Sequence, residues 1–102
     1  MPFGTGSAQG VFGAPTTPAT ASVTASSTQA VAANERRTHL VIVNLGTVSV
    51  SFGIGQAAVL GAGITLTANG GTWVMSVRTF STAAINAICA STSTLSIQEY
   101  QQ

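Results

Sequence analysis

The sequence predicts an all-β domain folded as an antiparallel sandwich or a small barrel. Apolar and polar residues alternate with a period of two in several short segments, and many of the apolar residues are β-branched. Turn signals rich in Gly, Asn and Ser separate these segments at a spacing of roughly ten residues. This combination is typical of seven or eight short strands in a single domain.

Residues 1–20 predict an extended arm ahead of a domain over residues 21–102. Gly and Pro recur in the arm without a periodic apolar pattern, which is typical of an irregular segment. Phe3, Val11 and Phe12 are large apolar residues within it. Such side chains indicate anchors that fill pockets on a neighbouring molecule. The alternative is an arm that folds back on its own domain.

The first half of the domain predicts a weak strand and a hairpin. Residues 21–31 are rich in Thr and Ser and indicate a weak strand followed by a loop. The apolar run at residues 38–44 predicts a central strand buried on both faces. Residues 47–54 alternate strictly, and with the preceding strand they predict a hairpin turning at Gly46. The residues expected to face inward are Val48, Val50, Phe52 and Ile54.

The second half predicts a further hairpin and two closing strands. Residues 55–63 are bracketed by glycines and indicate a loop or a short edge strand. Asn69 and Gly70 predict a type I′ turn that joins strands at residues 64–68 and 72–77. Further strands are expected at residues 82–90 and 94–101. The residues expected to face inward are Trp73, Met75, Val77, Ile85, Ala87, Cys89, Leu95 and Ile97.

Charge is scarce in this chain. Charged residues make up 5% of the sequence, whereas soluble domains usually carry about 25%. The ionised residues are Glu35, Arg36, Arg37, Arg78 and Glu99. Weakly polar surfaces cost little to desolvate, so the composition indicates a surface covered by partners. The alternative is a Ser/Thr-rich domain that is soluble alone.

The net charge and the single cysteine limit the partners and the compartment. A net charge of +1 argues against nucleic-acid binding by phosphate neutralisation and against electrostatic membrane binding. The apolar runs are much shorter than the ~20 residues that span a bilayer, and the N-terminus shows no secretory signal pattern. Cys89 has no partner for an internal disulfide. We therefore expect synthesis in a reducing cytoplasm.

The sequence predicts neither catalysis nor a cofactor. It contains one His, one Cys, two Glu and no Asp, so a Ser–His–Asp triad is impossible and only a Glu variant remains. His39 and Cys89 lie in apolar strands and are expected to be structural. No spacing suits zinc or calcium, and no Lys is present for a phosphate-binding loop. Phe52 and Trp73 alternate inward, which favours core packing over sugar binding.

The polar segment Glu35, Arg36 and Arg37 has two interpretations. It is either a solvated loop or an interface in which arginines pair with carboxylates on a partner. The candidate interface residues are therefore Phe3, Val11, Phe12, Glu35, Arg36 and Arg37.

Residues 33–46 resemble a segment of small structural proteins of tailed bacteriophages, in which a polar N-x-R-R loop precedes a strand that ends in Asn. The segments 63–66, 70–73 and 84–91 are similar to later parts of the same proteins. The resemblance covers residues 21–100 and excludes the arm.

This resemblance implies a capsid decoration, or cementing, protein with a jelly-roll-like β-sandwich fold. Such a protein sits on the capsid surface of the virion, binds the major capsid protein and neighbouring copies of itself as a dimer or trimer, and has no catalytic residues. Two alternatives remain open. One is a tail, neck or fibre-base component of the virion, and the other is a receptor- or carbohydrate-binding β module, which would need an exposed aromatic cluster.

Overall fold

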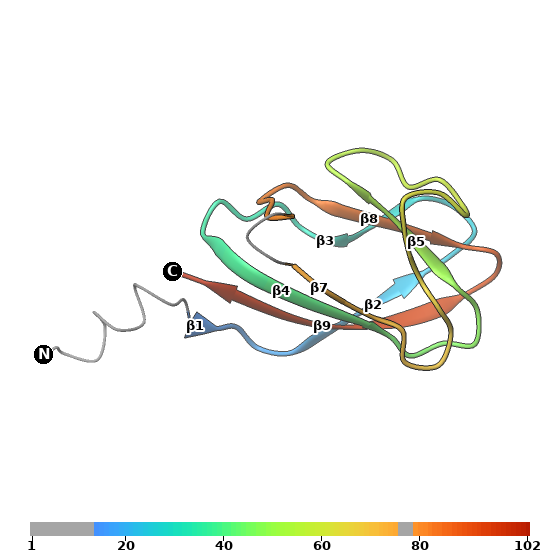
Figure 1. Cartoon of the computed structure of the whole chain (residues 1–102), viewed down its shortest axis with the longest axis horizontal. Coiled ribbons are helices and arrows are strands. Elements are labelled where there is room, and N and C mark those ends of the chain that lie inside the picture. The colour runs from blue at the N-terminus through green and yellow to red at the C-terminus, as the bar shows by residue number, and fades with distance from the viewer. Residues whose placement is uncertain (1–13, 76–78) are drawn as a thin grey trace, which may run out of the picture.

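The computed structural model describes residues 14–75 and 79–102, which form two antiparallel β-sheets that face each other (Figure 1). Sheet A contains β1 (Ala14–Pro15), β2 (Ala19–Val23), β9 (Ser93–Gln101), β4 (Arg37–Asn44) and β7 (Thr72–Val74). Sheet B contains β3 (Thr28–Val31), β8 (Ile85–Cys89), β5 (Val50–Ile54) and β6 (Ile64–Leu66). No helix occurs in the described residues. The prediction of an all-β sandwich is confirmed.

The strands pair in a nested order along the chain. β1 and β2 both pair with β9 and act as one interrupted edge strand. Strand β3 pairs with β8, β4 with β7, and β5 with β6. The first strand therefore pairs with the last, the second with the second to last, and so on inward. Two further pairings, β4 with β9 and β5 with β8, join these ribbons into the two sheets.

This order leaves one hairpin between consecutive strands, β5 to β6, connected by residues 55–63. Both predicted hairpins are wrong, because β4 and β5 lie in different sheets, and so do β6 and β7. The connections after β4 and after β6 instead cross the gap between the sheets, which is about 10 Å in packed sandwiches. Residues 55–63 form a loop, one of the two forms predicted for them.

The turn at Asn69 shows why the Asn-Gly sequence predicted a hairpin that does not form. Asn69 and Gly70 have φ values of 58° and 109°, the left-handed conformation that the sequence predicts. However, the Asn69 N–H donates to the Gly46 carbonyl at 2.8 Å and the Gly70 N–H to the Asn44 carbonyl at 2.7 Å. The turn is therefore held against the neighbouring connection rather than across a hairpin.

The N-terminal boundary of the domain also differs from the prediction. Ala14 pairs with Gln101, and the strand Ala19–Val23 runs along β9. Thr16 also donates its N–H to the Glu99 carbonyl at 2.8 Å. Residues 14–20 therefore belong to sheet A and not to an arm. Residues 1–13 lie outside the described residues.

The core lies between the sheets and follows the predicted alternation. It is made of buried residues that point inward from both sheets: Val23, Val31, Leu40, Ile42, Val50, Phe52, Leu66, Met75, Ile85, Ala87, Cys89, Leu95 and Ile97. Phe52 and Trp73 meet edge to face across the gap, with ring centroids 6.1 Å apart. β4 is central in its sheet, but Val41 and Val43 on its outer face are only half-buried, so the expected burial on both faces is not seen.

A buried asparagine joins the connections at the end of β4. Asn44 Nδ2 donates to the carbonyls of Val48 at 2.8 Å and Thr67 at 3.0 Å. Its Oδ1 accepts from the Gly46 N–H at 3.1 Å and from Ser93 Oγ at 2.6 Å. The side chain therefore ties the connections after β4 and after β6 to the first residue of β9.

Substituting Asn44→Asp should destabilise the domain by about 3 kcal/mol or more, because a carboxylate cannot donate to carbonyl oxygens and its charge would be buried. Asn69→Asp is the matched control, since Asn69 is exposed and Asp tolerates the left-handed conformation. Urea unfolding of the two variants measures the difference. Equal midpoints would show that Asn44 does not hold this end of the sandwich.

Candidate interaction surface

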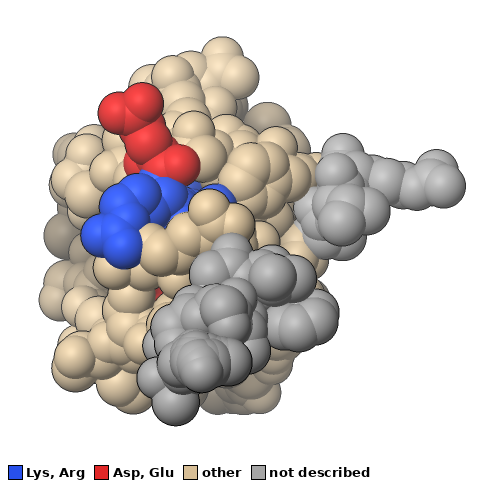
Figure 2. Space-filling view, turned by 90° about the vertical axis from the view of Figure 1, so that its left-hand side faces the viewer, with Lys and Arg blue, Asp and Glu red and all other residues tan. Residues whose placement is uncertain are grey.

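The charged residues of the described chain gather at one end of the sandwich. Glu35 and Arg36 lie in the connection between β3 and β4, Arg37 begins β4, and Glu99 lies near the end of β9. Figure 2 shows acidic and basic side chains of the described residues lying next to one another on this face. Arg78, the remaining charged residue, lies outside the described residues.

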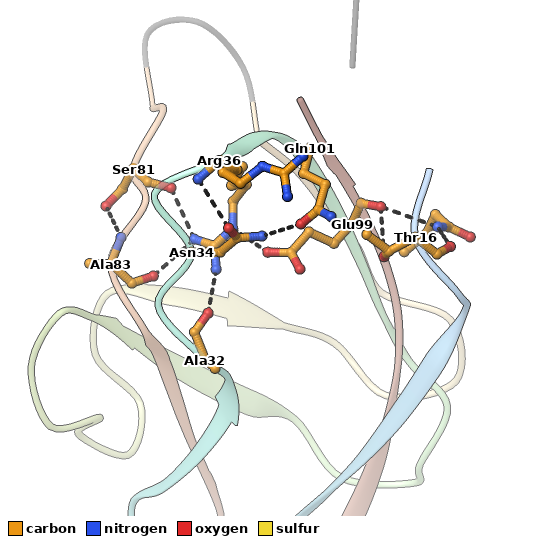
Figure 3. A network of polar contacts seen from close by, with 10 residues as sticks. Thr16, Ala32, Asn34, Arg36, Ser81, Ala83, Glu99 and Gln101 are labelled. Atoms are coloured by element: carbon orange, nitrogen blue, oxygen red, sulfur yellow. Dashed lines mark hydrogen bonds and ion pairs between the residues drawn. The ribbon is translucent and has the colours of Figure 1, made fainter. Parts of the chain in front are cut away.

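Arg37 is the centre of this cluster, and it is 2% exposed. Its Nε donates to Glu99 Oε2 at 2.7 Å. Its Nη1 donates to the carbonyls of Ser81 at 3.0 Å and Ala83 at 2.9 Å, and its Nη2 donates to the Ala32 carbonyl at 2.8 Å. As Figure 3 shows, these acceptors surround the guanidinium from different directions. Arg37 and Glu99 belong to sheet A, whereas Ala32 follows β3 and Ala83 precedes β8 of sheet B.

The surrounding loop is held by a second set of contacts. Asn34 Oδ1 accepts from the Arg36 N–H at 3.0 Å, and Asn34 Nδ2 donates to Gln101 Oε1 at 2.9 Å. The Gln102 N–H donates to the Arg36 carbonyl at 2.9 Å. The connection between β3 and β4 is therefore an ordered part of the domain, bonded to the end of β9 (Figure 3).

This geometry corrects one of the candidate interface residues. The Arg37 guanidinium is buried and bonded within the domain, so it does not present its charge to a partner. Glu35 and Arg36 are exposed, and their interface role stays a prediction. Phe3, Val11 and Phe12 lie outside the described residues.

The outer face of sheet A is not covered by any other element of the described residues, and the residues that form it carry no charge. Cross-strand register aligns Thr20, Ser96, Val43 and Thr72 in one row, Gln98, Val41 and Val74 in the next, and Tyr100 with His39 in the last. Residues that are paired across neighbouring strands share a face. We call this set of residues the sheet A face. The core was predicted from the inward residues, but this surface was not, although the same alternation places an uncharged residue at each of its positions.

The outer face of sheet B is partly covered by the chain itself. The loop at residues 55–63 lies over it, where the Ala58 N–H donates to Ser27 Oγ at 2.9 Å and the Gly61 N–H to Ser51 Oγ at 3.0 Å. A Cβ at Gly53 would lie 2.5 Å from the Gln56 carbonyl oxygen, so only glycine lets the loop approach this closely. Among the described residues, none forms a comparable cover over the sheet A face.

A groove with a volume of about 820 Å³ adjoins the sheet A face at the charged end. Its apolar wall consists of Val74, Met75 and Phe80, and Glu35, Arg36 and Gln102 lie on its polar side. Val74 is 49% exposed and Phe80 is 47% exposed, which makes this wall one of the apolar patches on the described surface. An apolar wall beside polar groups is the usual composition of a site that takes a peptide segment or a protein side chain.

The residues considered as catalytic or sugar-binding candidates do not form one site. They pack against other residues of the domain. His39 stacks edge to face with Tyr100, with centroids 5.6 Å apart, and Cys89 is buried in the core. Phe52 and Trp73 pack against each other inside, as expected. In residues 14–75 and 79–102, no group of three or more His, Cys, Asp or Glu side chains is placed to hold a metal ion. The same residues include no helix long and apolar enough to cross a membrane.

Comparisons of the chain with protein-family models, with curated proteins and with solved structures gave no match. The interpretation of the surface therefore depends on its own geometry and composition.

Substituting Arg37→Lys should lower the free energy of unfolding by about 3–5 kcal/mol, because one ammonium cannot reach four acceptors that lie in different directions. Arg36→Lys is the control, because the Arg36 side chain is exposed and its substitution should lower the free energy of unfolding by less than about 0.5 kcal/mol. Chemical denaturation followed by Trp73 fluorescence measures both. Similar losses in the two variants would refute the role given to Arg37.

Proposed function

We propose that this chain is a structural virion protein of a tailed bacteriophage, bound to the outside of the head as a decoration protein. In this role the sheet A face packs against the major capsid protein, and the charged end points toward neighbouring copies. The protein acts by bracing the shell and carries out no reaction.

The strand order supports a jelly roll as the finer description of the fold. A jelly roll is a long antiparallel ribbon, with the first strand paired to the last, wrapped into two four-stranded sheets. Counting β1 and β2 as one strand, the sheets here have the orders first–eighth–third–sixth and second–seventh–fourth–fifth. Viral capsid and lectin domains both use this architecture, so the fold alone does not choose between a virion role and carbohydrate binding.

The observation that carries the proposal is the uncharged, uncovered sheet A face. Interfaces within permanent assemblies are depleted of charge at their centre, and this face has no ionised residue in any of its three rows. A free monomer relies on surface charge for solubility. Charged residues make up only 5% of this chain. Both features favour a surface that is buried after assembly.

Carbohydrate binding has less support on the described surface. Sugar sites use exposed aromatic rings as stacking platforms, but Phe52 is buried, Trp73 is partly buried against it, and the Tyr100 ring is in edge-to-face contact with His39. Phe80 is the large aromatic side chain that is exposed in the described residues. We therefore do not advance this alternative.

The test is the number of copies in purified particles of the phage whose genome encodes the chain, measured by quantitative mass spectrometry and located by cryo-EM. A decoration protein is expected in hundreds of copies over the head. About a dozen copies or fewer on the particle axis would instead support a tail, neck or fibre-base component, because such parts follow the cyclic symmetry of the tail. Absence from the particle would overturn the virion proposal.

A charge placed on the sheet A face should block attachment without unfolding the domain. Ser96→Glu adds a carboxylate at the centre of this face, where burial against a partner would leave the charge unpaired. Gln29→Glu is the control, because Gln29 pairs with Asn86 and is exposed on sheet B. We expect head occupancy to fall at least about tenfold for Ser96→Glu and to stay unchanged for Gln29→Glu. The opposite pattern would assign the contact to sheet B.

A further inference from the structure

We propose that the groove at the charged end receives the Val11–Phe12 pair from the arm of a neighbouring copy of this chain. The inference deepens the self-association part of the proposed function, but it does not depend on the capsid. A chain that never bound a capsid would still exchange arms in this way.

The groove is suited to large apolar side chains from a neutral segment. Its apolar wall is formed by Val74, Met75 and Phe80, and two of these side chains are about half exposed in the isolated domain. The floor includes Thr38, whose Oγ1 is buried without a hydrogen-bond partner in residues 14–75 and 79–102. Buried hydroxyls usually have a partner, so Thr38 is an unsatisfied polar group directly beneath the groove.

The arm of the chain has the matching composition and starts nearby. Residues 1–13 contain no charged side chain, and their large apolar residues are Phe3, Val11 and Phe12, apart from Met1. The described chain begins at Ala14, which pairs with Gln101 next to the groove residue Gln102. The arm therefore leaves the domain at the same end as the groove.

Entropy favours Val11 and Phe12 over Phe3 as the anchors. Fixing the backbone costs about 1–2 kcal/mol per residue. An anchor two or three residues from Ala14 requires few residues to be ordered, whereas Phe3 requires the whole intervening segment to be fixed. Two adjacent apolar side chains close to the domain thus provide the largest net gain per ordered residue.

Phe12 is poorly placed to fill the apolar wall of its own groove. Val74 lies three strands away from Ala14 in the order β1, β9, β4, β7 and about three residues further along the sheet. At ~4.8 Å per strand and ~3.4 Å per residue, the two Cα atoms are about 17 Å apart. Two residues of extended chain span at most ~7 Å from Ala14 to Phe12, so Phe12 Cα stays about 10 Å from Val74 Cα of the same chain. A neighbouring copy has no such restriction, and we assign the occupant to it.

Disulfide trapping tests the contact on the full-length chain. Chains carrying Phe12→Cys are mixed with mass-tagged chains carrying Val74→Cys under mild oxidation, and a mixed covalent dimer is expected. The control replaces the second chain with Leu60→Cys, because Leu60 is 54% exposed but lies on the loop over sheet B. Cys89 is 1% exposed and should stay reduced, which each single variant checks alone.

The same two substitutions, placed together in one chain, distinguish binding of residues 11–12 in a neighbouring copy's groove from binding in the groove of the same chain. In the double variant, a link within one chain needs Cα atoms closer than about 7 Å, which the arm cannot provide from its own domain. We expect covalent dimers and higher species. A cross-linked monomer would overturn the exchange, and equal yields with Leu60→Cys would overturn the groove as the site.

Sedimentation equilibrium measures the contribution of each side chain. Losing a buried Phe corresponds to an increase of about 10- to 100-fold in the dissociation constant of self-association, so Phe12→Ser and Phe80→Ser should each show this change. Phe3→Ser and Leu45→Ser should change it less than about threefold. An equal effect of Phe3→Ser would overturn the assignment to Val11–Phe12, and a monomeric wild-type chain would overturn the proposal. Head occupancy, measured separately, tests the capsid role alone.

Discussion

The buried guanidinium of Arg37 is the interaction on which the charged end depends. A charge in the interior is costly unless it is paired and its hydrogen bonds are satisfied. Here one carboxylate neutralises it, and three carbonyls from two other segments complete its shell. Because those carbonyls flank strands of the opposite sheet, the charge can be buried only when the sheets meet in this arrangement. The interaction thus fixes the relative position of the sheets, and it contributes less to the free energy of unfolding than apolar packing does.

β4 carries a buried polar residue at each of its two ends, Arg37 and Asn44. Arg37 bonds β9 and the segments next to β3 and β8, and Asn44 bonds the connections after β4 and β6 and the first residue of β9. Between them the inward side chains of the strand are aliphatic and supply the core. Apolar packing alone tolerates shifts of register, whereas polar contacts at both ends oppose them. The register of β4 is therefore held at both ends, and so are the positions of the surfaces at the two ends of the sandwich.

The sequence allowed the strands and their inward faces to be predicted, because alternation is a local property that burial imposes. It misassigned both hairpins, since a turn signal such as Asn69-Gly70 specifies backbone conformation but not which strands pair. It also left Arg37 open as an interface residue, because a lone arginine in a sequence does not reveal acceptors that lie more than forty residues away. The groove combines residues from β4, β7 and the segment after it, so it could not be predicted before the topology was known.

The nested pairing has a consequence for the timing of folding. β9 is the last strand of the chain, yet it lies between the edge strand and β4 and forms the middle of sheet A. A growing chain can close the β5–β6 hairpin early, but sheet A has no centre until residue 101 leaves the ribosome. Such non-local pairing is intrinsically slow to form. Because sheet A gains its middle strand only with β9, a chain cut before residue 93 lacks the sheet A face, and the topology couples that surface to the synthesis of residues 93–101.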